Sequence, residues 1–196
     1  HVSNVCGSVT VVVFNYSMFF LKTGFQIVNV TLNGAKICAS HGNVSNVENI
    51  WLDVNEEGYY YTIAQMSGHP LNKTYNYNEF DPMAFFTGKI LDEGINTDSD
   101  GLYDYLKISI EINVTDAGDY SIYFKNLFDN QPNWLYEEQS FYGEFKKGLH
   151  LINFTVYGPK IYGAHLNPMF IQYLCLKVSS GWEWITLEER GNVPLP

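Results

Sequence analysis

The sequence contains one arginine, Arg190, and only six alanines and three cysteines in 196 residues. A single arginine argues against a phosphate clamp, and the net charge of −10 argues against binding to nucleic acids or anionic membranes. The shortage of alanine, set against 15 tyrosines and 13 phenylalanines, favours strands over helices. With 46% hydrophobic residues, the chain has enough apolar material for a sizeable core.

Long hydrophobic runs are also missing. The longest, residues 9–21, is interrupted by Asn15 and Ser17 and is too short to span a bilayer. No charged segment precedes it, as one would in an intact signal peptide. Because the chain begins at His1, we expect it to have been processed or trimmed.

The cysteine count is odd, so at most one intrachain disulfide can form and one thiol is left over. The candidates are Cys6, Cys38 and Cys175. Spacing does not say which two would pair. The sequence has no C-x-x-C motif, which argues against a zinc site.

What the sequence does contain is a short segment rich in oxygen ligands. Asn96, Asp98, Asp100 and Asp104 occupy positions 1, 3, 5 and 9 of a loop, with Gly101 at position 6; the carbonyl of Leu102 would serve as a further ligand. Calcium prefers six to eight hard oxygen ligands, and glycine permits the sharp turn. Position 12 is Lys107 rather than an EF-hand glutamate, and residues 107–113 alternate as a strand does. The pattern predicts a calcium loop that leads into a β-strand; a metal-free Asx-rich turn is the alternative.

Six N-x-S/T sequons are present, about three times the number that this composition would give by chance. In three of them, alternation along an expected strand directs the asparagine away from the more apolar face, as a glycan requires. We therefore predict an extracellular glycoprotein that carries N-linked glycans at Asn15, Asn29, Asn43, Asn72, Asn113 and Asn153.

The N-terminal segment is apolar at nearly every position of a short stretch. A strand that is apolar on both faces must be buried on both faces. It is either a central strand of its own domain or a strand donated to a neighbouring subunit. The candidate donor residues are Val9, Val11, Val12, Val13 and Phe14.

Turn signals recur about every ten residues and no helical period is sustained, which predicts an all-β protein of Ig-like or pilin-like sandwiches. We expect an N-terminal strand in residues 1–20, a β region in 21–80 and a calcium-loop sandwich in 81–196. Within 24–38 we expect a hairpin that turns at Asn33-Gly34. A further strand over 59–66 is expected to break at 67–70. Later strands are expected near 83–91, 107–113, 120–125, 134–136, 149–157, 169–178 and 182–187.

The calcium loop also carries a family resemblance. The segment Asn96-x-Asp98-x-Asp100-Gly-Leu-Tyr-Asp104-Tyr-Leu, with its flanking residues, resembles a β-sandwich module of archaeal secreted and surface proteins. The resemblance covers roughly residues 73–196 and implies a calcium site in the loop. The sequence departs from the module at Asn96, where the module usually has Asp, and at Ser99, where Gly is common.

In overall character the chain is similar to subunits of archaeal threads and bundling pili. In those filaments, the N-terminal strand of each subunit completes the sandwich of the next. The resemblance implies a structural subunit that assembles head to tail on the cell surface, with a role in adhesion or biofilm. It rests on the apolar segment 9–14 and on the sequons.

Two other functions fit the sequence. The first is a calcium-binding surface or S-layer-associated adhesive module that does not polymerise. The second, more remote, is a polysaccharide monooxygenase in which His1 and a second histidine hold copper; His41, His69, His150 and His165 are the candidates for that partner. No hydrolase motif is present, and we predict that the chain is not an enzyme. The tryptophans, Trp51, Trp134, Trp182 and Trp184, are expected to pack in the core, although exposed ones would suit sugar stacking.

Overall fold

The computed structural model describes residues 27, 29–131, 133–180 and 183–196. The expected donor strand, residues 9–14, lies outside this part of the chain. The chain divides into two compact units, residues 1–81 and 82–196. In the described part of the chain, no helix is long and apolar enough to cross a membrane.

The first unit contains a short helix, α1 (Gly34–Ala39), where the sequence predicted a hairpin turn. That prediction was wrong because the Asn33 side chain caps the helix. Its Oδ1 accepts hydrogen bonds from the backbone N–H groups of Ala35, at 2.9 Å, and Lys36, at 3.4 Å. A Cβ added at Gly34 would lie 2.7 Å from Cδ1 of the Phe80 ring, so packing against this ring requires glycine here. Asn-Gly is therefore used here as a helix start.

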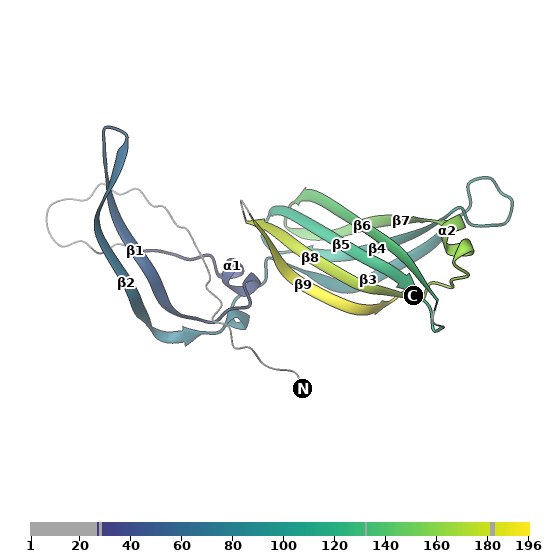
Figure 1. The fold of residues 1–196 in the computed structure, drawn as a ribbon, viewed down its shortest axis with the longest axis horizontal. Coiled ribbons are helices and arrows are strands. Elements are labelled where there is room, and N and C mark those ends of the chain that lie inside the picture. The colour runs from purple at the N-terminus through teal and green to yellow at the C-terminus, as the bar shows by residue number, and fades with distance from the viewer. Residues whose placement is uncertain (1–26, 28, 132, 181–182) are drawn as a thin grey trace. The chain divides into compact units, whose positions relative to one another are not determined.

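The rest of the first unit is a long antiparallel hairpin of β1 (Val44–Glu56) and β2 (Tyr59–Tyr75), visible in Figure 1 as a two-stranded ribbon. Its turn is Glu57-Gly58, and both residues have positive φ, as hairpin turns require. The predicted break at 67–70 does not occur: Pro70 pairs with Asn46 and His69 with Val47. Proline is tolerated because both strands of a two-stranded sheet are edges. A 3-10 turn, η1 (Tyr77–Glu79), follows.

The second unit is a sandwich of two antiparallel sheets. The three-stranded sheet has the order β3-β4-β7, from β3 (Ala84–Ile95), β4 (Tyr105–Val114) and β7 (Gly148–Tyr157). The four-stranded sheet has the order β6-β5-β8-β9, from β6 (Trp134–Phe145), β5 (Gly118–Phe128), β8 (Phe170–Ser180) and β9 (Glu183–Pro194). The all-β sandwich prediction is confirmed.

Alternating side chains build the core between these sheets. Ile108, Ile110 and Ile112 of β4 are almost wholly buried, at 0, 1 and 0% exposure. In β7 the same parity buries Ile152, Phe154 and Val156. The ring of Phe154 meets that of Phe124 of β5 edge to face, with centroids 5.0 Å apart. This contact joins the sheets at the centre of the sandwich.

A second short helix, α2 (Gly158–Gly163), connects β7 to β8 and was not predicted. Its six residues are too few to show a helical period in the sequence. Figure 1 shows α2 at the same end of the sandwich as the loop between β3 and β4. That loop is the predicted calcium loop.

Candidate metal-binding loop and glycan-acceptor sites

Residues 96–104 form the connection from β3 to β4, so the candidate ligands all lie in one hairpin loop. The loop is closed at its base by the Asp104 backbone N–H, which donates to the Ile95 carbonyl at 2.8 Å. The strand predicted after the loop is present as β4. The structure therefore brings the sequence-predicted ligands together on one short segment of backbone.

In the first part of the loop, the side chains of Asn96, Asp98 and Asp100 each accept a hydrogen bond from a backbone N–H two or three residues ahead. Asn96 Oδ1 accepts from Ser99 at 2.7 Å and from Asp98 at 3.2 Å. Asp98 Oδ1 accepts from Asp100 at 3.1 Å, and Asp100 Oδ1 accepts from Leu102 at 2.8 Å. These successive Asx turns coil the backbone around the side-chain oxygens.

Positive φ occurs twice in this loop, at Ser99 (67°) and at Gly101 (91°). Glycine adopts that conformation freely, which explains Gly101. At Ser99 the same conformation costs energy, and the bond from its N–H to Asn96 offsets part of that cost. A glycine would suit position 99 better.

Asp104 is fixed by Thr97 rather than by its immediate neighbours. Its Oδ2 accepts from the Thr97 hydroxyl at 2.5 Å and from the Thr97 backbone N–H at 2.6 Å. The hydroxyl bond first, and then the backbone bond, lower the pKa of this carboxyl. Asp104 is therefore held as an anion, and Thr97 is a positioning residue that the sequence pattern did not reveal.

The donor set suits a hard cation such as calcium. It consists of three carboxylates, one amide oxygen and the Leu102 carbonyl, all at exposed or half-buried positions. Each carboxylate has an oxygen outside the loop's hydrogen bonds. Among the residues that the structure describes, no three His, Cys, Asp or Glu side chains are gathered as a metal cluster.

Two glycines position the loop from outside. Gly158 lies where a Cβ would come within 2.2 Å of the Tyr103 carbonyl oxygen. Gly94 lies against the ring of Tyr103: a Cβ added at Gly94 would lie 2.7 Å from Cγ of that ring. The Gly158 contact joins segments more than fifty positions apart in the sequence, so spacing within the motif could not predict it.

The described sequon asparagines lie at accessible positions. Asn29, Asn43, Asn72 and Asn153 are exposed, Asn113 is half-buried, and Asn15 lies outside the described residues. Asn153 alternates with the buried residues of β7, as the strand parity predicted. Its Oδ1 accepts from the Ser109 hydroxyl at 2.7 Å, which leaves Nδ2, the atom that would carry a glycan, outside that bond.

The remaining candidate residues are dispersed. Cys38 is a half-buried free thiol and Cys175 a buried one, while Cys6 lies outside the described residues. Burial raises the pKa of Cys38, and the nearby Asp81 carboxylate adds to the shift. For the copper hypothesis, His1 also lies outside the described part. His150 is engaged by the Lys146 carbonyl at 2.7 Å and by the Phe145 ring.

The tryptophans depart from the expected core packing. Trp51, Trp134 and Trp184 are 51, 60 and 46% exposed, while Trp182 is not described. Surface tryptophans of this exposure are costly to solvate and suit contact with a ligand or another chain.

No protein-family profile and no curated protein matches this chain. Among solved structures, the chain is similar to a DUF4785 family protein from Legionella pneumophila, with 13% identity and a TM-score of 0.41. The match covers 74% of this chain and 34% of that structure, so the chain spans about a third of its length. A likeness this distant says nothing about function.

Proposed function

We propose that the chain is a structural subunit of a glycosylated, extracellular filament of the cell surface, assembled head to tail by strand exchange. The observation that carries the proposal is the β1–β2 hairpin. It is a two-stranded sheet that exposes an apolar stripe. Isolated two-stranded sheets are marginally stable in water, and an exposed apolar edge invites pairing with another chain.

The stripe lies on one face of the hairpin. Alternation in β1 places Ile50, Leu52 and Val54 on one face, and the register pairs them with Met66, Ala64 and Tyr61. Their large side chains are 43–54% exposed. Tyr59, opposite Glu56, extends the stripe toward the turn and is 70% exposed. We call these residues the hairpin stripe: Ile50, Leu52, Val54, Tyr59, Tyr61 and Met66.

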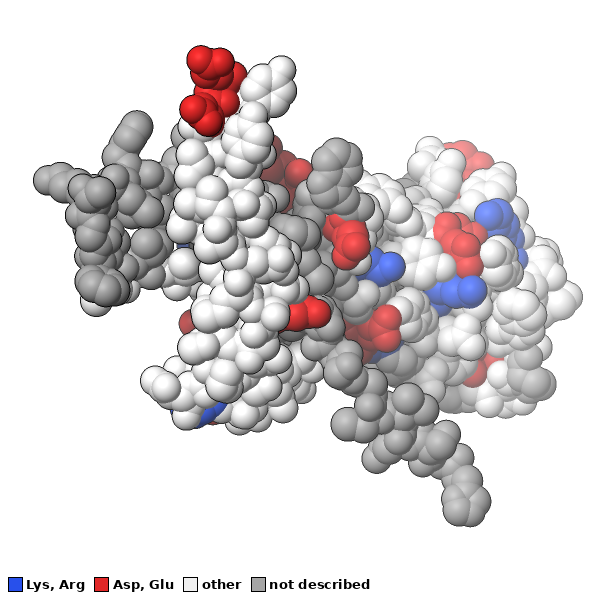
Figure 2. Space-filling view, turned by 60° about the vertical axis from the view of Figure 1, so that its left-hand side comes forward, with Lys and Arg blue, Asp and Glu red and all other residues white. Residues whose placement is uncertain are grey.

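Charge is scarce along the same hairpin. In Figure 2 the visible surface of the hairpin is mostly uncharged. The charged residues of the hairpin are Glu48, Asp53, Glu56, Glu57 and Lys73. A long, sparsely charged ribbon of apolar and tyrosine side chains is the kind of surface that marks an interaction site.

The donor in this assembly is the segment 9–14. Burial of its side chains in a neighbouring subunit would contribute on the order of 10 kcal/mol before entropy costs. Such a contact is heterologous and does not close, so it extends into a filament. Glycans at the exposed sequons and calcium in loop 96–104 would suit an extracellular setting, where both are available.

A second function, a tethered adhesive module that does not polymerise, is favoured by the second unit. There β4 and β5 are each paired on both sides within their own sheets, and the core is complete without an added strand. This module would share the calcium loop and glycans. It differs in needing no exchange of strands.

The hairpin stripe can be tested by adding one charge to either face. In Leu52→Asp the charge lies within the stripe; in the matched control, Gln65→Asp, it lies on the opposite face beside Trp51. We expect sedimentation velocity to show large assemblies for the wild type and the control, and their loss in Leu52→Asp. Assemblies of equal size in all three chains would overturn the role of the stripe.

A further inference from the structure

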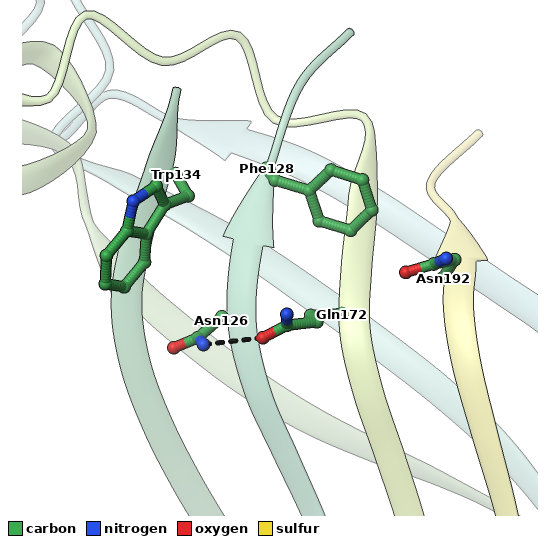
Figure 3. Close-up of a pocket in the computed structure, with 5 residues that line it drawn as sticks. All are labelled: Asn126, Phe128, Trp134, Gln172 and Asn192. Carbon is green, nitrogen blue, oxygen red and sulfur yellow. Dashed lines mark hydrogen bonds between the residues drawn. The ribbon is translucent and has the colours of Figure 1, made fainter. Parts of the chain in front are cut away.

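One end of the four-stranded sheet holds a pocket of about 360 Å³ that belongs neither to the calcium loop nor to the hairpin. Its walls come from all four strands: Trp134 of β6, Asn126 and Phe128 of β5, Gln172 of β8 and Asn192 of β9. In Figure 3 the three amides form a row across the sheet and the two aromatic side chains lie beside that row. None of the five carries a charge.

A disturbance of the sheet aligns the amides. The buried hydrophobic residues of β5 alternate as 120, 122 and 124, but the next of them is Leu127, three positions after Phe124. In β8, Ile171 and Leu174 are likewise both buried although three positions apart. The alternation of buried hydrophobic residues therefore shifts by one position at the same level of β5 and β8. Asn126 and Gln172 occupy that level, between the pairs Lys125–Tyr173 and Leu127–Ile171.

Asn126 and Asn192 adopt positive φ, 55° and 51°, within strands. This conformation is uncommon outside glycine and costs energy, and such residues cluster at functional sites. Asn126 stands at a register shift between β5 and β6, where two residues of one strand face one of the other. Within the described strands of the sandwich, the non-glycine residues with positive φ are thus the two asparagines that line the pocket.

Hydrogen bonds fix two of the three amides and leave some of their donors and acceptors unused. Asn126 Nδ2 donates to Gln172 Oε1 at 2.7 Å, and Asn126 Oδ1 accepts from the Glu137 backbone N–H at 3.3 Å. Asn126 is 7% exposed and holds Gln172 in place. The Gln172 Nε2 group remains available, and among described residues the Asn192 amide has no hydrogen-bond partner. Donors and acceptors are thus presented without charge.

The aromatic wall is fixed as well. Trp134 pairs with Phe128 across the strands, and the Phe128 ring stacks on Phe170 with centroids 5.0 Å apart. The preceding turn is braced by buried Asp129, which accepts from the Gln131 N–H at 2.7 Å and from the Asn133 amide at 3.3 Å. The exposed indole therefore extends from a backbone that is fixed on both sides, which lowers the entropic cost of binding.

We propose that this pocket binds a neutral saccharide, with Trp134 stacking on a pyranose ring and the Gln172 and Asn192 amides bonding its hydroxyls. A pyranose has an apolar face of C–H groups and a rim of hydroxyls that both donate and accept. A flat indole beside neutral amides matches both features, and an uncharged lining favours an uncharged ligand. The inference holds whether or not the chain polymerises.

Binding is tested with the full, unglycosylated chain and a panel of neutral trisaccharides of glucose, galactose, mannose and N-acetylglucosamine, measured by calorimetry. We expect at least one to bind, and Trp134→Ala to weaken it about tenfold or more. Asn192→Gly removes the amide while keeping the positive φ, so it should weaken binding without loss of stability. The control is Trp184→Ala, an exposed tryptophan of the same sheet outside the pocket.

A second arm separates the two sources of such a sugar. If the ligand is a glycan of another copy, the glycosylated chain should self-associate, and both glycan removal and Trp134→Ala should reduce that association. If the ligand is an external polysaccharide, the free trisaccharides should bind, but neither glycan removal nor Trp134→Ala should change the self-association of the glycosylated chain. The proposal is overturned if no trisaccharide binds at 10 mM (about the weakest affinity worth assigning), or if Trp134→Ala and Trp184→Ala bind alike.

Discussion

The backbone N–H of Gly158 donates a hydrogen bond of 2.6 Å to the carbonyl oxygen of Asp104. This bond joins the first residue of α2 to the last candidate ligand of loop 96–104. Asp104 in turn donates its own N–H to Ile95, so both ends of the loop are tied to the sandwich. The loop is therefore anchored by a residue more than fifty positions away.

We expect Gly158→Ala to destabilise the sandwich by about 1–3 kcal/mol, because the added Cβ would meet two backbone carbonyl oxygens that cannot move aside. Gly163→Ala is the matched control, since it lies in the same helix and no atom lies within 4 Å of its added Cβ. Chemical denaturation measures both. Equal stability of the two variants would contradict the anchoring role.

Calcium should raise the melting temperature of the wild-type chain, and a chelator should lower it again. Binding to the folded state alone stabilises that state, and removal of the ion leaves several carboxylates close together without compensation. Asp100→Ala should abolish the difference between the two conditions. A melting temperature that does not change between excess calcium and excess chelator would refute the metal site.

Native material should be heavier than the bare 22.4 kDa chain by the mass of glycans at the exposed sequons. Intact mass spectrometry before and after glycan removal measures this. Asn72→Gln should remove one glycan without affecting folding, because the side chain is exposed. A native mass equal to that of the bare chain would count against an extracellular glycoprotein.

Tyr120 should make stability depend on pH in the alkaline range. Burial raises its pKa to about 12, with a contribution from Asp116. The neutral phenol is favoured in the folded state, so its contribution is complete below about pH 10 and is lost as the pH rises toward 12. Its hydroxyl also donates to the backbone carbonyls of Met83, at 3.2 Å, and Asp116.

We therefore expect Tyr120→Phe to lose about 1–3 kcal/mol at pH 8 and to show a smaller decline between pH 10 and pH 12. Unfolding free energies at several pH values measure both effects. The control is Tyr142→Phe, which removes a hydroxyl at a position that is 64% exposed. If the unfolding free energy of Tyr120→Phe declined as steeply between pH 10 and pH 12 as that of the wild type, the decline would come from other tyrosines.

The sequence predicted the sandwich well where local pattern and tertiary packing agree. Ile108, Ile110 and Ile112 alternate in the sequence and are buried in the structure, because strand parity directly decides which face meets the core. The strand after loop 96–104 was predicted for the same reason. The loop's backbone also follows local rules, since asparagine, aspartate and glycine favour the turns seen there.

Prediction failed where a contact distant in sequence decides the local structure. Asn33-Gly34 starts a helix because Asn33 caps it and the Phe80 ring occupies the space beside Gly34. The role of Gly158 depends on Tyr103 and Asp104, which no local pattern connects to it. Asn126 and Asn192 lay beyond the ends of the expected strands 120–125 and 182–187, whereas the structure places them inside strands with positive φ, where they help to shape the pocket.

The proposal of a filament subunit is tested most directly by measuring the mass of the full chain in solution over a range of concentrations. Light scattering should show assemblies that grow with concentration, and Val11→Asp should prevent them without changing the calcium response. A chain without residues 1–14 should remain a single subunit and bind a peptide of residues 9–14. A full chain that is monomeric at high concentration, with residues 9–14 protected from hydrogen exchange, would contradict the proposal and favour the tethered module.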